Sequence, residues 1–343
     1  MEECNIVGID LAKNVFQVHA SDEVGRRLFS KKVSRGQLLK LMSTIRPCVV
    51  ALEACASAHH WGRQIAKLGH EVKLIPPIYV KPFVKRQKND AADAEAIVEA
   101  ASRPTMRFVA VKSADQQAAG MAFKTRDLFV RQRTQLINAL RGHLAEHGVV
   151  APQGVVHLKR LRAALADETT GLPTAVVLHA GMILDQISVL QSRIEKLEKE
   201  IFAVSRKEDL AVRLMTIPGV GPITAAALLA FAPDPATFRR GRDFSAWMGL
   251  TPRQHSSGGK ERMGRTSKMG HRDLRRLLIT GAMAVVRWAA RKGAQAGSWL
   301  ARMLDRKPKM LIAVALANRM GRIIWALMAN GGTYNSHRDT AQA

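Results

Sequence analysis

Four acidic residues occupy positions from which they could act together on a phosphate. Asp10 and Glu53 each end an apolar run with the pattern of a β-strand, and Asp90 and Asp93 stand three residues apart where a helical pattern begins. That spacing places Asp90 and Asp93 on one face of the helix. Charged side chains at the ends of apolar strands are hard to bury without a partner, and a divalent cation would supply one.

The chemistry that such a cluster supports is metal-assisted phosphoryl transfer. Mg²⁺ takes hard oxygen ligands, and two ions about 3.5 to 4 Å apart clamp the attacking and leaving oxygens of a displacement at phosphorus. We therefore expect Asp10, Glu53, Asp90 and Asp93 to bind Mg²⁺ or Mn²⁺. A structural alternative stays open for these acids. Asn89 or Asp90 caps the helix, the helix dipole favours Asp93 in the first turn, and Asp10 caps a turn.

The charge of the chain indicates a polyanionic partner. Lys and Arg number 53 against 28 Asp and Glu, which gives a net charge of +25. Residues 251–325 alone hold 17 Lys or Arg and three acids, a local excess of 14 positive charges. Such an excess is typical of proteins that bind phosphates, so we expect nucleic acid, and DNA first, as the partner.

Composition narrows the class of protein. With 343 residues, 47% of them hydrophobic, the chain can bury a large core and is not disordered. Its three cysteines are too few and too badly spaced for a zinc site or a disulfide framework. We found neither a signal-peptide pattern nor an uninterrupted apolar run of spanning length, because Arg319 and Arg322 interrupt the best one. We expect a cytoplasmic, nucleoid-associated protein with no membrane partner.

The elements that must position the acids form an α/β pattern. Residues 4–20 have the pattern of a hairpin of two short strands. Further strands are expected at 27–33, 48–53 and 72–76, with a helix at 36–43. This order predicts an α/β domain with a mixed sheet, followed by a mainly helical remainder.

Two long helical segments follow. Residues 113–147 have the pattern of one helix, and residues 183–204 repeat apolar side chains at spacings of 4 and 3, as in a coiled-coil seam. Two interpretations are equally open. The seam packs against the 113–147 helix of the same chain, or it joins copies into a dimer or tetramer.

Gly219 and Gly221 lie in the stretch IPGVGP, which precedes an Ala-rich helix. This is the pattern of a helix-hairpin-helix, in which glycines let backbone N–H groups approach a DNA phosphate at a helix N-terminus. A simple packing turn explains the same residues about as well.

The motifs around these residues resemble those of a known family. Asp10 in GID, Glu53 in ALEAC, and Asp90 with Asp93 in KNDAADAEAI are similar to the signature of DEDD transposases, insertion-sequence recombinases to which Piv-type DNA invertases are related. The stretches IPGVGPITAAALLA and FSAWMGLTPRQHSSGGKERMG resemble the second conserved region of that family, and the resemblance covers about residues 4–290.

The resemblance implies a fold, a metal and a nucleophile. Its members have a RuvC-like, ribonuclease-H-type catalytic domain in which the four acidic positions bind Mg²⁺. A serine in the C-terminal domain forms a covalent bond to DNA, and a bridge RNA selects donor and target DNA. The family serine directly precedes a glycine, as Ser257 does here, and Ser256 is the second candidate. The basic residues expected to bind nucleic acid near it are Arg253, Lys260, Arg262, Arg265, Lys268, Arg272, Arg275 and Arg276.

We therefore expect four regions. They are a RuvC-like domain at 1–150, a coiled-coil or helical linker at 151–208, a C-terminal transposase domain with the serine loop at 209–330, and a disordered tail at 331–343. The leading hypothesis is an RNA-guided transposase. The rivals are a RuvC-like junction nuclease that uses water, and a basic nucleic-acid-binding protein without catalysis.

Overall fold

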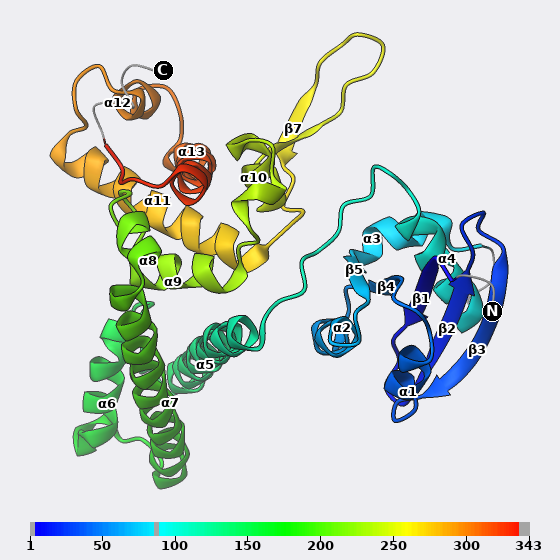
Figure 1. Cartoon of the computed structure of the whole chain (residues 1–343). Helices are drawn as coiled ribbons and strands as arrows, with labels where there is room; N and C mark the ends of the chain where they lie inside the picture. Colours follow the sequence, from blue (N-terminus) through cyan, green and yellow to red (C-terminus); the bar gives the residue numbers. More distant parts are fainter. Residues whose placement is uncertain (1–3, 86–88, 336–343) are drawn as a thin grey trace. The chain divides into compact units, whose positions relative to one another are not determined.

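The computed structural model describes residues 4–85 and 89–335. Its contacts divide the chain into two compact units, Met1–Gln117 and Ala118–Ala343. We describe each unit by itself (Figure 1). The boundary falls within the long helix α5, whereas the sequence analysis placed the end of the catalytic domain at residue 150; those functional domain limits stay a prediction.

A five-stranded mixed sheet forms the centre of the first unit. Its strands are β1 (Ile6–Asp10), β2 (Val15–Ser21), β3 (Arg27–Ser34), β4 (Val49–Glu53) and β5 (Glu71–Ile75), in the spatial order β3-β2-β1-β4-β5. β2 runs antiparallel to β1 and β3, while β1, β4 and β5 run parallel. The predicted α/β domain with a mixed sheet is confirmed.

Helices cover both faces of this sheet. One core packs Leu38 and Met42, and Trp61 and Ile65, against one face; the other packs Val80 and residues of α4 against the opposite face. Figure 1 shows α4 lying along the sheet. The helices are α1 (Leu38–Ser43), α2 (Ala58–Ala66), α3 (Pro77–Val80) and α4 (Asp90–Ala101), with a short 3-10 turn at Lys81–Phe83.

The second unit begins with a helical arm. Its helices are α5 (Ala114–Ala145), α6 (Leu158–Ala166) and α7 (Thr174–Lys207). Leu140 and Leu144 of α5 share one core with Leu184 and Ile187 of α7. The predicted seam is therefore largely buried within one chain, although Val204 at its end is 50% exposed. Oligomerisation through α7 stays a prediction.

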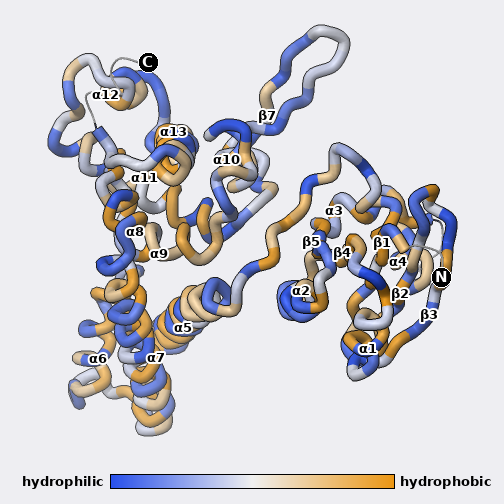
Figure 2. Tube along the Cα trace, in the orientation of Figure 1, coloured by the Kyte–Doolittle hydropathy of each residue, from blue (hydrophilic) through white to orange (hydrophobic). Residues whose placement is uncertain are grey.

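A second helical layer completes this unit around one large core. Buried side chains from α8, α9, α10, α11 and α13 form a single cluster, and Figure 2 colours much of α13 as apolar. The elements are α8 (Asp209–Leu214), α9 (Pro222–Phe231), 3-10 turns at Val155–His157, Glu168–Thr170 and Pro235–Thr237, α10 (Gly241–Trp247), β6 (Pro252–Gln254), β7 (Met263–Thr266), α11 (Arg272–Lys292), α12 (Trp299–Leu304) and α13 (Lys309–Asn330).

Two further expectations concern the C-terminal tail and membrane-spanning segments. Residues 331–335 have no regular structure, and the rest of the predicted disordered tail lies outside the described residues. The sequence analysis expected no uninterrupted apolar run of spanning length; by length and mean hydropathy alone, the helices α7 and α13 are long and apolar enough to cross a membrane. Both helices also contribute to the cores of their unit, and core helices of soluble proteins pass the same test.

Candidate active site and nucleic-acid interface

Two of the predicted acids lie on neighbouring parallel strands. Ile9 of β1 is in register with Leu52 of β4, so the next residues, Asp10 and Glu53, come side by side at the carboxyl ends of the strands. Both are half-buried. The carboxyl ends of parallel strands are where α/β folds bind ligands.

The start of α4 brings Asp93 to the same edge. Asn89 caps this helix, since its side-chain oxygen accepts a hydrogen bond from the Ala91 N–H at 2.8 Å. The capping interpretation is thus confirmed for Asn89. It leaves Asp90 and Asp93 in the first turn, where the helix dipole favours carboxylates.

Gly8 permits α4 to lie directly on β1. A Cβ atom at Gly8 would be 2.5 Å from the Ala94 carbonyl oxygen and 2.7 Å from Val98 Cγ2. Since Ala94 directly follows Asp93 and Gly8 stands two residues before Asp10, this close approach sets the separation between the helix acid and the strand acids. The sequence analysis overlooked Gly8, because its partner is more than 80 residues away in the chain.

The electrostatics show that Asp10 and Asp93 act on Glu53. Burial raises the pKa of Glu53 above its ordinary value, and the charges of Asp10 and Asp93 raise this pKa further. Cys55 lies in the same field, because burial and the charges of Glu53 and Asp10 raise the pKa of its thiol. Glu53 forms no ion pair with any residue that the structure describes.

The fourth predicted acid lies apart from this group. Asp90 is exposed, and its carboxylate lies 3.8 Å from the Lys32 ammonium on β3. It is not among the groups that shift the pKa of Glu53. The structure therefore brings Asp10, Glu53 and Asp93 together and leaves Asp90 at the rim.

These side chains fit a divalent cation in their chemistry. Within residues 4–85 and 89–335, no three His, Cys, Asp or Glu side chains already converge on ligand distances. The donors nevertheless are carboxylates, and, after burial, repulsion from the charges of Asp10 and Asp93 raises the pKa of Glu53. A cation with oxygen ligands would offset that repulsion.

Ser257 lies at the tip of a β-hairpin. β6 and β7 are antiparallel, and the Lys260 N–H donates to the Ser257 carbonyl at 3.1 Å across the turn. Gly258 (φ +57°) and Gly259 (φ +76°) occupy the two central positions, both with the left-handed conformation that a type I′ turn requires. The segment predicted as the serine loop is thus a hairpin with a tight turn.

The two candidate serines differ in their hydrogen bonds. Ser256 Oγ accepts a hydrogen bond from the Arg262 N–H at 3.3 Å, which ties it into the hairpin. The Ser257 side chain is exposed and has no hydrogen bond with the described residues. This difference leaves the Ser257 hydroxyl accessible to a substrate.

The predicted basic residues fall into two groups. Those of the hairpin and its exit are exposed, with Lys268 in a left-handed conformation (φ +54°). Arg275 is different, because its guanidinium donates to the Met248 carbonyl at 3.0 Å, and burial lowers its pKa. Arg276 pairs with Asp127 of α5 at 2.5 Å. The exposed residues that form no ion pair with a described residue are Arg253, Lys260, Arg262, Arg265, Lys268 and Arg272.

The glycine turn before α9 has a packing role. Gly219 has φ +89°, and a Cβ there would lie 2.9 Å from the Gly281 carbonyl oxygen of α11. A Cβ at Gly221 would meet no atom within 4 Å. The close approach of this turn to α11 thus accounts for Gly219, and contact of this turn with DNA stays a prediction.

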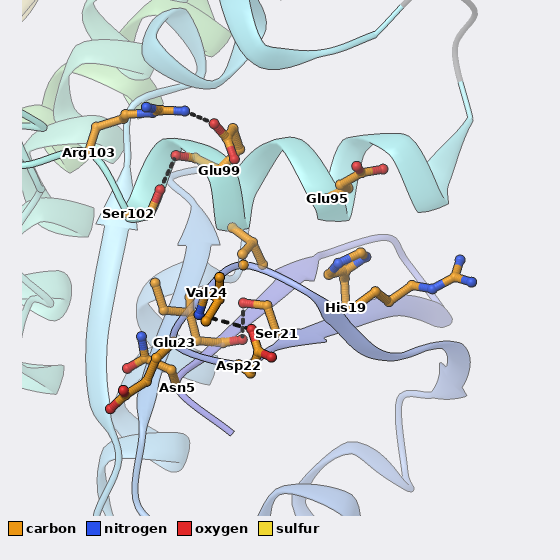
Figure 3. Close-up of a pocket in the computed structure, with 14 residues that line it drawn as sticks. Asn5, His19, Ser21, Asp22, Glu23, Val24, Glu95, Glu99, Ser102 and Arg103 are labelled. Atoms are coloured by element: carbon orange, nitrogen blue, oxygen red, sulfur yellow. Dashed lines mark hydrogen bonds and ion pairs between the residues drawn. The ribbon is translucent and has the colours of Figure 1, made fainter. Parts of the chain in front are cut away.

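One pocket of the first unit lies away from the acidic cluster. It has a volume of about 640 Å³ and is lined by residues of β2, the turn after it and α4, including the buried His19 (Figure 3). Burial lowers the pKa of His19, and the charge of Glu95 acts in the opposite direction. Glu95 itself pairs with Lys85 at 2.6 Å. None of the four predicted acids lines this pocket.

Comparisons with known proteins give the family. Residues 211–296 match the model of the Transposase IS116/IS110/IS902 family, and residues 7–148 match a DEDD transposase model. A probable family 20 transposase of Pseudomonas aeruginosa is 46% identical over 96% of this chain and 98% of its own length. The transposase for insertion sequence element IS1328 of Yersinia enterocolitica is 39% identical over 98% of this chain and 100% of its own.

The chain belongs to the IS116/IS110/IS902 family of transposases, and it is therefore an enzyme that cuts and rejoins DNA. Enzymes of this DEDD class generally use divalent metal ions. Among solved structures, T. thermophilus RuvC in complex with a Holliday junction substrate matches 30% of this chain and 98% of that chain at 15% identity, with a TM-score of 0.24. No conclusion about the present chain follows from a match at that score.

Proposed function

We propose that this transposase holds Mg²⁺ or Mn²⁺ with Asp10, Glu53 and Asp93, and with Asp90 once a cation is bound, and that Ser257 is its nucleophile. The observation that carries the metal site is the cluster of three carboxylates whose burial and repulsion raise the pKa of Glu53. When bound, the cation would supply charge stabilisation at the scissile phosphate. The carboxylates themselves orient that cation.

Ser257 would carry out the exchange of bonds. A bond forms between Ser257 Oγ and phosphorus while a P–O bond of the DNA backbone breaks; the Ser257 hydroxyl gives up its proton, and the released DNA oxygen takes one up, so the step is balanced. The resulting phosphoserine preserves the bond energy, so that a second DNA hydroxyl can displace the serine and rejoin the strand. The support is the tight Gly258–Gly259 turn, which presents the Ser257 side chain at the hairpin tip.

The guide and the assembly are part of the same proposal. We infer that a bridge RNA selects the donor and target DNA, and that two or four copies assemble for a reaction on two DNA ends. The support is the net charge of +25, which favours polyanionic partners, together with the family membership. The hairpin must then meet the carboxylate cluster of its own chain or of another copy.

A covalent-trapping assay tests the nucleophile. Labelled donor and target DNA are incubated with Mg²⁺, with and without transcripts of the noncoding flanks of the element, and protein–DNA adducts are resolved in denaturing gels. We expect an adduct that requires the RNA, disappears in Ser257→Ala and persists in Ser256→Ala, the matched control. An intact adduct in Ser257→Ala would refute the serine assignment, and cleaved ends without any adduct would favour the water-using nuclease.

A further inference from the structure

Helix α11 carries a tryptophan on its exposed side. Trp288 is 59% exposed, whereas Trp61 is 5% exposed. Trp325 donates its indole N–H to a backbone carbonyl, Trp299 lies beneath an arginine, and Trp247 stacks on a phenylalanine. Trp288 has no hydrogen bond or ring contact with the described residues, so the fold of this unit does not account for it.

The side chains around Trp288 are cationic. Arg287, Arg291 and Lys292 stand one residue before it and three and four residues after it, so all lie within about one helical turn. All three are exposed, and none forms an ion pair with a residue that the structure describes. The sequence 274–292 contains no Asp or Glu. Trp288 thus has three cationic neighbours on its own helix, in a stretch that holds no acid.

The glycine turn before α9 lies on the same side of α11 as Trp288. A Cβ at Gly219 would lie 2.9 Å from the Gly281 carbonyl and 3.1 Å from Val285 Cγ2. Gly281 and Val285 stand seven and three residues before Trp288, spacings that share one helical face. The turn and Trp288 therefore follow one another along a single side of the helix.

We propose that Trp288 stacks on an unpaired base of single-stranded DNA, while Arg287, Arg291 and Lys292 bind the adjoining phosphates. Aromatic stacking needs an exposed face of the base, which an intact duplex does not offer, and it tolerates any sequence because every base has such a face. The single strand is DNA, because the enzyme cuts and rejoins DNA and this reaction exposes unpaired bases. A single exposed aromatic residue is common on protein surfaces, and here the cations beside it distinguish the site.

Binding of a short single-stranded DNA, measured by fluorescence anisotropy in EDTA, tests the stacking without any contribution from cleavage. We expect Trp288→Ala to weaken binding about 5- to 150-fold, while Trp288→Phe loses about threefold or less. The slope of affinity against salt should stay unchanged in both variants, since no charge is removed. Leu178→Ala is the matched control, because Leu178 is also 59% exposed and lies on α7, and its affinity should equal the wild type.

Three results would overturn the proposal. They are unchanged affinity of Trp288→Ala, an equal loss for intact duplex DNA, and a loss seen only with RNA of the same sequence. Circular dichroism and thermal unfolding of each variant separate a lost contact from a lost fold. The assay needs neither the metal site nor Ser257. The stacking proposal can therefore be refuted while the proposed function holds, and the proposed function can be refuted while the stacking proposal holds.

Discussion

Replacing Gly8 with alanine tests how the acidic cluster is positioned. A Cβ atom at this residue of β1 would lie 2.5 Å from the Ala94 carbonyl oxygen, and real Cβ contacts essentially never fall below 3.0 Å. α4 must therefore retreat by about 0.5 Å to reach 3.0 Å, and by about 0.9 Å to reach an ordinary contact of 3.4 Å. The obstructing atom belongs to the backbone, so a rotamer change cannot relieve the contact.

The expected effect on activity is far larger than the effect on folding. Adding a methyl group to a packed site costs about 1 to 3 kcal/mol, which a domain with about 5 to 15 kcal/mol of stability survives. Asp93 directly precedes Ala94 and moves with the helix, away from Asp10 and Glu53. A displacement on the order of 1 Å in a catalytic group costs about 100-fold in rate. We expect Gly8→Ala to fold and to cleave DNA about 100-fold more slowly.

The assay compares initial cleavage rates at saturating Mg²⁺ with thermal unfolding of the same samples. Gly36→Ala is the matched control, because it lies in the same unit, a Cβ there meets no atom within 4 Å, and its φ does not lie in the left-handed region. It should cleave at the wild-type rate. A Gly8→Ala protein that cleaves normally would refute the reasoning, as would a loss that only mirrors its unfolded fraction at the assay temperature.

Two further substitutions test the electrostatics of the site and the packing of α11. Burial and neighbouring acids raise the pKa of Glu53 in the folded state, so ionising Glu53 costs stability as pH rises through that pKa. Glu53→Gln removes this cost. It should therefore raise the Tm at neutral pH in EDTA and leave the Tm unchanged at acidic pH. It should also abolish stabilisation by Mg²⁺, which for wild type is about 2.7 kcal/mol at 100 times Kd; an unchanged Mg²⁺ response would contradict the metal site. Gly219→Ala should lower the free energy of unfolding by about 1 to 3 kcal/mol in urea, because φ is +89° and Gly281 lies 2.9 Å away; Gly221→Ala is its control, and equal effects would show that packing is not the cause.

The sequence was most informative where structure depends on neighbouring residues. Alternating and apolar runs located all five strands of the first unit to within a few residues, and they placed Asp10 and Glu53 at strand ends. The role of Gly8 could not be predicted, because it depends on α4 crossing β1 at Ala94, a contact between distant parts of the chain. A single sequence contains no signal for such a contact.

Ambiguity remained where one pattern serves two purposes. A heptad repeat is satisfied by any apolar partner helix, so only the packing of Leu140 and Leu144 against α7 shows that α5 is a partner. The hairpin around Ser257 was missed although Gly258-Gly259 is a strong turn signal, because its strands are short and polar. Asp90 has the expected helical spacing from Asp93. It is exposed, however, and its carboxylate pairs with the ammonium of Lys32.

The distribution of charge implies an order of events at the acidic cluster. A net charge of +25 attracts DNA to the protein as a whole. A phosphate that approaches Asp10, Glu53 and Asp93, however, meets acids among which burial and the charges of Asp10 and Asp93 already raise the pKa of Glu53. Protonation would relieve this repulsion as pH falls, whereas a divalent cation relieves it without a change of pH and adds attraction for phosphate. Cation binding should therefore precede or accompany the arrival of the scissile phosphate, and DNA bound in EDTA should contact the basic surfaces while remaining outside the cluster.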